Sequence, residues 1–253
     1  MAAAARTLVA GFLTCVAVLL GLPFLVLWTW LTGNPDFMYR VSMNFCRFAV
    51  RLLGIRARVE GIENIPPGAC IFAANHVSNL DGVILLPAIP RRVSLFAKRE
   101  LFRLPVLGLG MRLAGFVAVD RVGRQAAAGI ATAVDTLKRG LSVFIFPEGT
   151  RSPDGRLQPF KKGAFAMAIE AGVPVVPVSI AGTHRLLRRG EWIVRPGEVV
   201  VHFASAVEPP AYTMKDRAEL LARVESLIAA ALPPDQKPDQ KLGPQPAPAS
   251  GTP

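Results

Sequence analysis

The hydrophobic positions divide the chain into an apolar start, an alternating middle and a polar end. From Thr7 to Thr32 no residue is charged, and this run of 26 residues exceeds the ~20 that cross a bilayer. A cleaved secretory signal is the alternative, but the run is longer than a typical signal core. The pattern therefore predicts a membrane-inserted segment over residues 1–34. Pro23 near its middle predicts a bend, so the segment either crosses the bilayer or enters one leaflet.

Residues 35–54 are predicted to form a basic amphipathic helix. Its apolar positions recur three and four residues apart: Phe37, Val41, Phe45, Phe48 and Leu52. Its polar stripe has the same spacing: Arg40, Asn44, Arg47 and Arg51. Beside an apolar segment this pattern is typical of a helix among lipid headgroups, although a helix packed on the core shows it too. Because arginines follow the apolar segment and only Arg6 precedes it, the rest of the chain is predicted on the cytoplasmic face of the inner membrane.

Short apolar runs alternate with helical patterns from Ile55 onward. Seven runs predict strands: Ile55–Glu60, Ala69–Ala74, Val93–Ala97, Phe116–Val119, Ser142–Phe146, Val175–Ile180 and Glu198–Phe203. Helices are predicted around them, among them Ala126–Arg139 and Leu220–Leu232. This alternation predicts an α/β domain over residues 55–232, with a twisted mixed sheet flanked by helices. Residues 233–253 are rich in proline and glutamine without an apolar period, which predicts a disordered tail.

Composition narrows the choice of partner. The chain has 253 residues, a formal net charge of +11 and 51% hydrophobic residues, with a mean hydropathy of +0.38. The charge favours an anionic partner, while the hydropathy and the lack of a zinc-finger, RRM or homeodomain signature argue against nucleic acid. An anionic membrane surface fits both properties. The three cysteines (Cys15, Cys46 and Cys70) lack metal-ligand spacing, so free thiols are expected and no metal site is predicted.

The first candidate chemistry lies in the heptad Asn75-His76-Val77-Ser78-Asn79-Leu80-Asp81, between a predicted strand and an apolar run that could open a helix. A histidine at a strand end and an aspartate at the start of the next helix can face each other across the turn. The carboxylate would then hold one ring nitrogen as a donor and leave the other free to accept a proton as a general base. An ordinary turn with Asn, Ser and Asp as cap formers is the alternative.

A second polar cluster follows about 70 residues later, at the end of the apolar run Leu141–Phe146. It reads Pro147-Glu148-Gly149-Thr150-Arg151-Ser152. Open α/β sheets place binding residues at the carboxyl ends of their strands, so this cluster could lie beside the heptad and bind a ligand with it. A simple ion pair between Glu148 and Arg151 is the alternative.

Taken together, the two motifs resemble the glycerolipid acyltransferase family. Three further blocks match in order: Lys98-Arg99-Glu100-Leu101, Gly115-Phe116-Val117-Ala118-Val119-Asp120-Arg121 and Val173-Pro174-Val175-Val176-Pro177-Val178. The resemblance extends from about residue 59 to about residue 207 and implies the α/β fold of that family. It also implies transfer of a fatty acyl chain from a thioester of acyl-carrier protein or coenzyme A to the membrane lipid 1-acyl-sn-glycerol 3-phosphate, which gives phosphatidic acid. No cofactor besides the donor is expected.

The resemblance and the chemistry of the side chains assign expected roles. His76 and Asp81 form the catalytic pair. Three cations are expected at the acceptor phosphate: Arg151, Lys98 and Arg121. Four residues are expected to orient the substrate: Glu148, Gly149, Ser78 and Asn75. Lys161 and Lys162 are expected to serve lipid headgroups or an acidic carrier protein.

The acceptor stays open at this point, because Val77 occupies a position that varies among acceptor classes of the family. Glycerol 3-phosphate, another lysophospholipid and a lyso-ornithine lipid are alternatives. A non-catalytic lipid-binding membrane protein is the alternative from a different class of function. The sequence does not indicate an oligomeric state.

Overall fold

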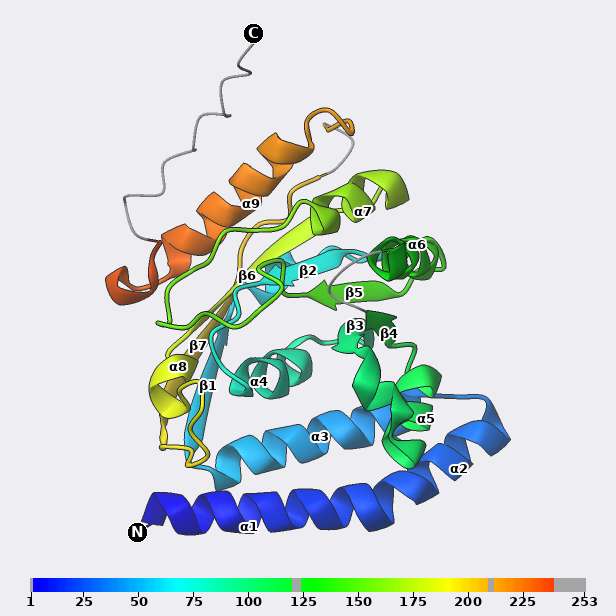
Figure 1. Ribbon diagram of the computed structural model, residues 1–253, viewed down its shortest axis with the longest axis vertical. Coiled ribbons are helices and arrows are strands. Elements are labelled where there is room, and N and C mark those ends of the chain that lie inside the picture. The colour runs from blue at the N-terminus through cyan, green and yellow to red at the C-terminus, as the bar shows by residue number, and fades with distance from the viewer. Residues whose placement is uncertain (1, 120–123, 209–211, 239–253) are drawn as a thin grey trace, which may run out of the picture.

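A seven-stranded sheet lies at the centre of the computed structural model, which describes residues 2–119, 124–208 and 212–238 (Figure 1). The strands lie in the order β1-β7-β6-β2-β5-β3-β4. Their bounds are β1 Ile55–Glu60, β2 Ile71–Ala74, β3 Val93–Lys98, β4 Val117–Val119, β5 Ser142–Ile145, β6 Val175–Ala181 and β7 Gly197–Phe203. Each predicted strand is present within two residues of its predicted ends, and the predicted α/β class is confirmed.

Strand direction gathers many loops at one edge of the sheet. Neighbouring strands are parallel except β6 and β7, which are antiparallel, with Ala181 opposite Val200. The carboxyl ends of β2, β3, β4, β5 and β6 therefore lie at the same edge. Because β1 and β7 run the other way, their first residues also lie there. Loops from distant parts of the described sequence consequently meet at this edge.

Helices cover both faces of the sheet (Figure 1). One face packs against α3 Asp36–Leu52, α4 Leu80–Ala88 and the short α8 Thr183–Leu186. The other packs against α6 Arg124–Lys138, α7 Gly163–Ala171 and α9 Arg217–Ala231. Strand β2 faces both layers, with Phe72 and Ala74 toward the first and Ile71 and Ala73 toward the second. All four side chains are fully buried, so the strand that leads into the heptad is held rigidly.

The N-terminal helix runs along the lower side of the domain in Figure 1. It consists of α1 Ala2–Val16, a π-helical turn Ala17–Gly21 and α2 Leu22–Thr32, and it bends at the turn that precedes Pro23. Its 31 residues are long and apolar enough to cross a membrane. The helix contacts the domain at both ends. Near its start, Thr7 accepts a hydrogen bond from the backbone of Val194, and α2 packs on α5 Pro105–Leu113.

Helix α3 lies between the N-terminal helix and α4 and packs on the domain, which is one of the two arrangements that its sequence allowed. It packs through Met38, Tyr39 and Val50, which are buried. Most of its predicted apolar stripe is exposed, including Phe37 and Phe48. Such a surface beside the apolar N-terminal helix is consistent with a helix at the lipid interface.

The first residues of the predicted disordered tail are ordered and pack against the domain. Pro234–Gln236 form a 3-10 turn, and Gln236 is almost completely buried. The side-chain oxygen of Gln236 accepts a hydrogen bond from the backbone N–H of Gly182, and its carbonyl accepts one from Leu157. The predicted boundary at Pro233 is therefore wrong, because a glutamine can satisfy loop backbone groups that no apolar pattern reveals. Residues 239–253 lie outside the described part of the chain.

Candidate active site

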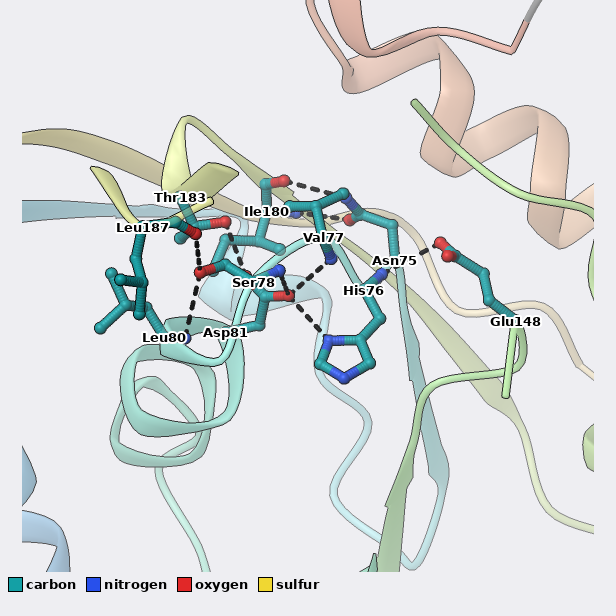
Figure 2. A network of polar contacts seen from close by, with 10 residues as sticks. All are labelled: Asn75, His76, Val77, Ser78, Leu80, Asp81, Glu148, Ile180, Thr183 and Leu187. Atoms are coloured by element: carbon teal, nitrogen blue, oxygen red, sulfur yellow. Dashed lines mark hydrogen bonds and ion pairs between the residues drawn. The ribbon is translucent and has the colours of Figure 1, made fainter. Parts of the chain in front are cut away.

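The histidine and the aspartate of the heptad face each other in the structure (Figure 2). His76 follows β2 and Asp81 lies in the first turn of α4, and 2.8 Å separates His76 Nδ1 from Asp81 Oδ2. The Asp81 side chain is fully buried, whereas 20% of the His76 side chain is exposed. The second ring nitrogen, Nε2, points away from the residues drawn in Figure 2 and bonds to no residue that the structure describes. Nε2 is therefore the atom available to a substrate.

Three further donors hold the Asp81 carboxylate in place. The backbone N–H groups of Val77 and Ser78 donate to Oδ2 at 2.7 and 2.8 Å, and the hydroxyl of Thr183 donates to Oδ1 at 2.6 Å. These bonds compensate a buried carboxylate for the water it has lost. They also direct an acceptor oxygen at the imidazole, so Nδ1 carries the proton and Nε2 is the basic nitrogen. The arrangement is that of a general base with an orienting carboxylate.

The second polar cluster lies against the first through its backbone. Glu148 Oε1 accepts a hydrogen bond from the backbone N–H of His76 at 3.0 Å, and the N–H of Ser152 donates to the His76 carbonyl at 2.8 Å. The Phe146 ring stacks on the imidazole, with 3.9 Å between ring centroids and 13° between planes. The loop after β5 therefore fixes both the backbone and the ring plane of His76. Nothing in the sequence marks Phe146 as a site residue, because it lies in an apolar run.

Glu148 is buried, and its expected role in orienting the substrate stays a prediction. Its Oε2 atom has no partner among the described residues, and burial raises the pKa of Glu148 to about 8. No ion pair joins it to Arg151 among the described residues, which contradicts the alternative of a simple ion pair between the two. The structure instead places this side chain under the histidine backbone, where it supports the turn.

Basic groups lie at the same edge of the sheet. Arg151 is partly exposed and makes no hydrogen bond or ion pair with any described residue, so its guanidinium is available to an anion. Gly149 has a φ of 73°, and a side chain there would come within 2.7 Å of the Lys161 ammonium. This contact places Lys161 over the turn. Lys98 ends β3 at this edge, opposite Val119 in the register. Arg121, the third expected phosphate ligand, lies outside the described residues.

Two residues expected to orient substrate are structural instead. The Asn75 amide donates to the Ile180 carbonyl and accepts from the Ile180 N–H, which ties the end of β2 to β6. The Ser78 hydroxyl donates to the carbonyl of Leu187 at 2.8 Å. Both side chains are buried, so neither can reach a substrate. Asn75 therefore holds the turn that carries His76 against β6, and Ser78 holds it against the segment that follows β6.

Known proteins that are similar to this chain are acyltransferases. A family model described as Acyltransferase matches residues 56–181. The 1-acyl-sn-glycerol-3-phosphate acyltransferase of Pseudomonas aeruginosa is 34% identical over 198 residues, which cover 76% of each chain. The chain belongs to the acyltransferase family.

Two further relatives extend this finding. The chloroplastic 1-acyl-sn-glycerol-3-phosphate acyltransferase BAT2 of Brassica napus is 36% identical over 184 residues, which cover 68% of this chain and 53% of that protein. The chain thus matches about half the length of that relative. The crystal structure of the 1-acyl-sn-glycerophosphate acyltransferase PlsC from Thermotoga maritima superimposes with a TM-score of 0.78 at 32% identity. The superposition covers 88% of this chain and 91% of that one, so the fold is shared over nearly the whole chain.

Proposed function

We propose that the protein transfers a fatty acyl group from a thioester to the free hydroxyl of 1-acyl-sn-glycerol 3-phosphate, which yields phosphatidic acid. The observation that carries this proposal is the His76–Asp81 pair, whose Nε2 lies at the same sheet edge as Arg151; neither group has a partner among the residues that the structure describes. A base and a cation at one edge suit an acceptor that carries both a hydroxyl and a phosphate. The relatives named for this reaction support the choice of acceptor.

The proposed chemistry needs no protein nucleophile. His76 Nε2 takes the proton of the acceptor hydroxyl as its oxygen attacks the thioester carbonyl carbon, and Asp81 stabilises the imidazolium that forms. The tetrahedral intermediate then expels the thiolate, which takes the proton from His76. An ester and a free thiol result, and the histidine returns to its neutral form. Ser78 takes no part, because its hydroxyl is buried and bonded to a carbonyl.

The acceptor is a lipid, so the site must work at a membrane. The N-terminal helix contacts the domain near Thr7 and again near Gly110, where Leu22 and Val26 lie within 3.4 Å of where a Cβ would stand. A helix held at both ends lies along the domain, and we infer that it enters one leaflet in the membrane plane instead of crossing the bilayer. The exposed apolar side chains of α1 and α2 then contact the lipids of the cytoplasmic leaflet.

An assay of the purified protein tests the proposed reaction. Acyl-carrier protein and coenzyme A thioesters are each offered with lysophosphatidic acid, glycerol 3-phosphate, an uncharged-headgroup lysophospholipid and a lyso-ornithine lipid. Efficient transfer to lysophosphatidic acid, lost in His76→Ala, is the expected result. Preference for another acceptor would replace the proposed substrate while keeping the chemistry. Equal activity of wild type and His76→Ala would overturn the mechanism.

A further inference from the structure

The connection between α8 and β7 carries an unusually exposed apolar tip. Trp192 is 88% exposed and Ile193 is 49% exposed, and Trp192 exceeds every other large apolar side chain among the described residues. Arg188, Arg189 and Arg195 flank these two residues and are exposed as well. We call residues 188–193 the tip. An exposed tryptophan among arginines is typical of a membrane–water interface, where the ring lies at headgroup level.

The tip is held firmly at its base. The N–H of Arg195 donates to the Leu186 carbonyl at 2.8 Å and closes the loop. Leu187 and Val194, which border the tip, are buried, and Glu191 forms an ion pair with Arg195. Trp192 is therefore exposed because the hydrogen bond, the ion pair and the buried residues at the base hold the tip away from the core.

The tip adjoins the surface that we propose lies in lipid. Val194 donates its backbone N–H to Thr7 of α1, and the next residue of α1, Leu8, is 73% exposed. Arg6 lies close by, within 2.7 Å of where a Gly54 side chain would begin. The apolar helix and the tip thus form one continuous surface with a net positive charge, which complements an anionic leaflet.

We propose that the tip is a second membrane contact, in which Trp192 and Ile193 enter the lipid interface while Arg188 and Arg189 bind anionic headgroups. This proposal rests on the proposed membrane attachment of the N-terminal helix. A leaflet that takes up the exposed side of α1 also reaches the space beside the tip, which favours lipid over a docked protein. An acidic acyl-carrier protein bound to the same arginines is the competing partner.

The contact between the tip and the membrane determines the distance between the active site and the lipid. Thr183 binds Asp81 and the Leu187 carbonyl binds Ser78, so the segment that ends in the tip also holds the catalytic turn. Trp192 is five positions after Leu187, which is at most about 18 Å of extended chain. A lipid acceptor therefore needs only a short displacement from the leaflet to meet the histidine.

Tryptophan fluorescence tests the contact directly, because the chain has only three tryptophans, Trp28, Trp30 and Trp192. The full-length W28F/W30F protein is reconstituted in vesicles that contain phosphatidylglycerol, and flotation confirms that it is bound. We expect the Trp192 emission to shift to shorter wavelength, to be quenched by nitroxide lipids, and to be shielded from aqueous iodide. The matched control is W28F/W30F/W192F/M214W, since Met214 is 51% exposed and lies before α9, away from α1. Its emission should remain accessible to iodide.

Activity provides a second readout. R188Q/R189Q should lower turnover of vesicle substrate by about fivefold for each arginine, from the ~1 kcal/mol that each contributes at an anionic surface. Turnover of micellar substrate should stay unchanged. Equal iodide quenching of tryptophan at positions 192 and 214 in vesicle-bound protein would overturn the proposed membrane contact. The proposed acyl-transfer reaction would not be affected by that result. A Trp192 shift caused by acyl-carrier protein in detergent, with none in vesicles, would assign the tip to the carrier instead.

Discussion

Asp81→Asn separates the charge of the Asp81 carboxylate, which we propose takes part in catalysis, from its geometry. Oδ2 of Asp81 accepts hydrogen bonds from the Val77 and Ser78 backbone and lies opposite His76 Nδ1. An asparagine must present its oxygen to these three donors, because its NH₂ group would oppose two N–H groups. The amide nitrogen then faces the Thr183 hydroxyl, which can accept. The substitution therefore keeps the fold and the tautomer of His76 but removes the negative charge.

The expected loss of kcat in Asp81→Asn follows from the removed negative charge alone. A hydrogen bond to a charged group contributes about 1.5–3 kcal/mol against about 1 kcal/mol for a neutral one, and this difference of about 0.5–2 kcal/mol sets a lower bound of about twofold in kcat. Two unit charges about 4 Å apart attract by about 4 kcal/mol at an effective dielectric constant near 20, which sets an upper bound near a thousandfold. The loss should stay below that of His76→Ala, where the base itself is gone and about 10²–10⁴-fold is expected.

The assay measures initial rates on detergent-dispersed lysophosphatidic acid together with thermal unfolding. Thr183→Val is the matched control, because it removes a donor to the same carboxylate but leaves the charge and the histidine contact. It should cost about 1–3 kcal/mol of stability and little activity. Unchanged kcat in Asp81→Asn would refute the role of the charge. Losses of activity that simply follow the loss of stability in both variants would refute it as well.

Three further predictions concern the loop after β5. Arg151→Ala should raise KM for a phosphate-bearing acceptor by about 10–100-fold, with partial recovery in Arg151→Lys, and an equal effect on an acceptor without phosphate would contradict the assignment. Burial raises the pKa of Glu148 from 4.5 to about 8, so the folded protein retains this proton where the unfolded chain has released it. The free energy of unfolding should therefore fall between about pH 4.5 and pH 8, by about 1.4 kcal/mol for each unit of the raised pKa, and level off above pH 8. Glu148→Gln should flatten this slope in denaturant titrations, and an unchanged slope would place the proton elsewhere. Gly149→Ala should lose more activity than Gly172→Ala, because both glycines have positive φ but only the first has Lys161 where the new Cβ would stand. Equal losses would show that backbone strain alone matters.

The local pattern of apolar residues predicted the strands and helices well, whereas it did not predict contacts between segments that are distant in the sequence. The strands were predictable because buried runs such as Ile71–Ala74 have a short, bounded length that the sequence displays. The His76–Asp81 pair was predictable because five positions separate its members. Thr183 completes the carboxylate site from 102 residues away, and nothing near it in the sequence marks it as a partner of Asp81.

The mistaken roles have a related cause. Asn75 and Ser78 lie in a polar motif, and motif membership does not say whether a side chain faces the substrate or the protein. Their partners, Ile180 and Leu187, contribute only backbone groups, which any residue type could offer. Gln236 likewise binds backbone groups, so its burial left no trace in the hydrophobic pattern.

The π-helical turn at Ala17–Gly21 determines which side of the N-terminal helix meets the protein. Thr7 and Val26 are 19 positions apart, and at about 100° per residue an uninterrupted α-helix would point them about 100° away from each other. A π-helical turn takes up one extra residue, which brings the angular difference close to zero. Both contacts with the domain then fall on one side, although the helix is apolar all round. None of the five residues in the turn is buried. The turn therefore rotates the helix because it contains one extra residue, and not because its side chains pack on the domain.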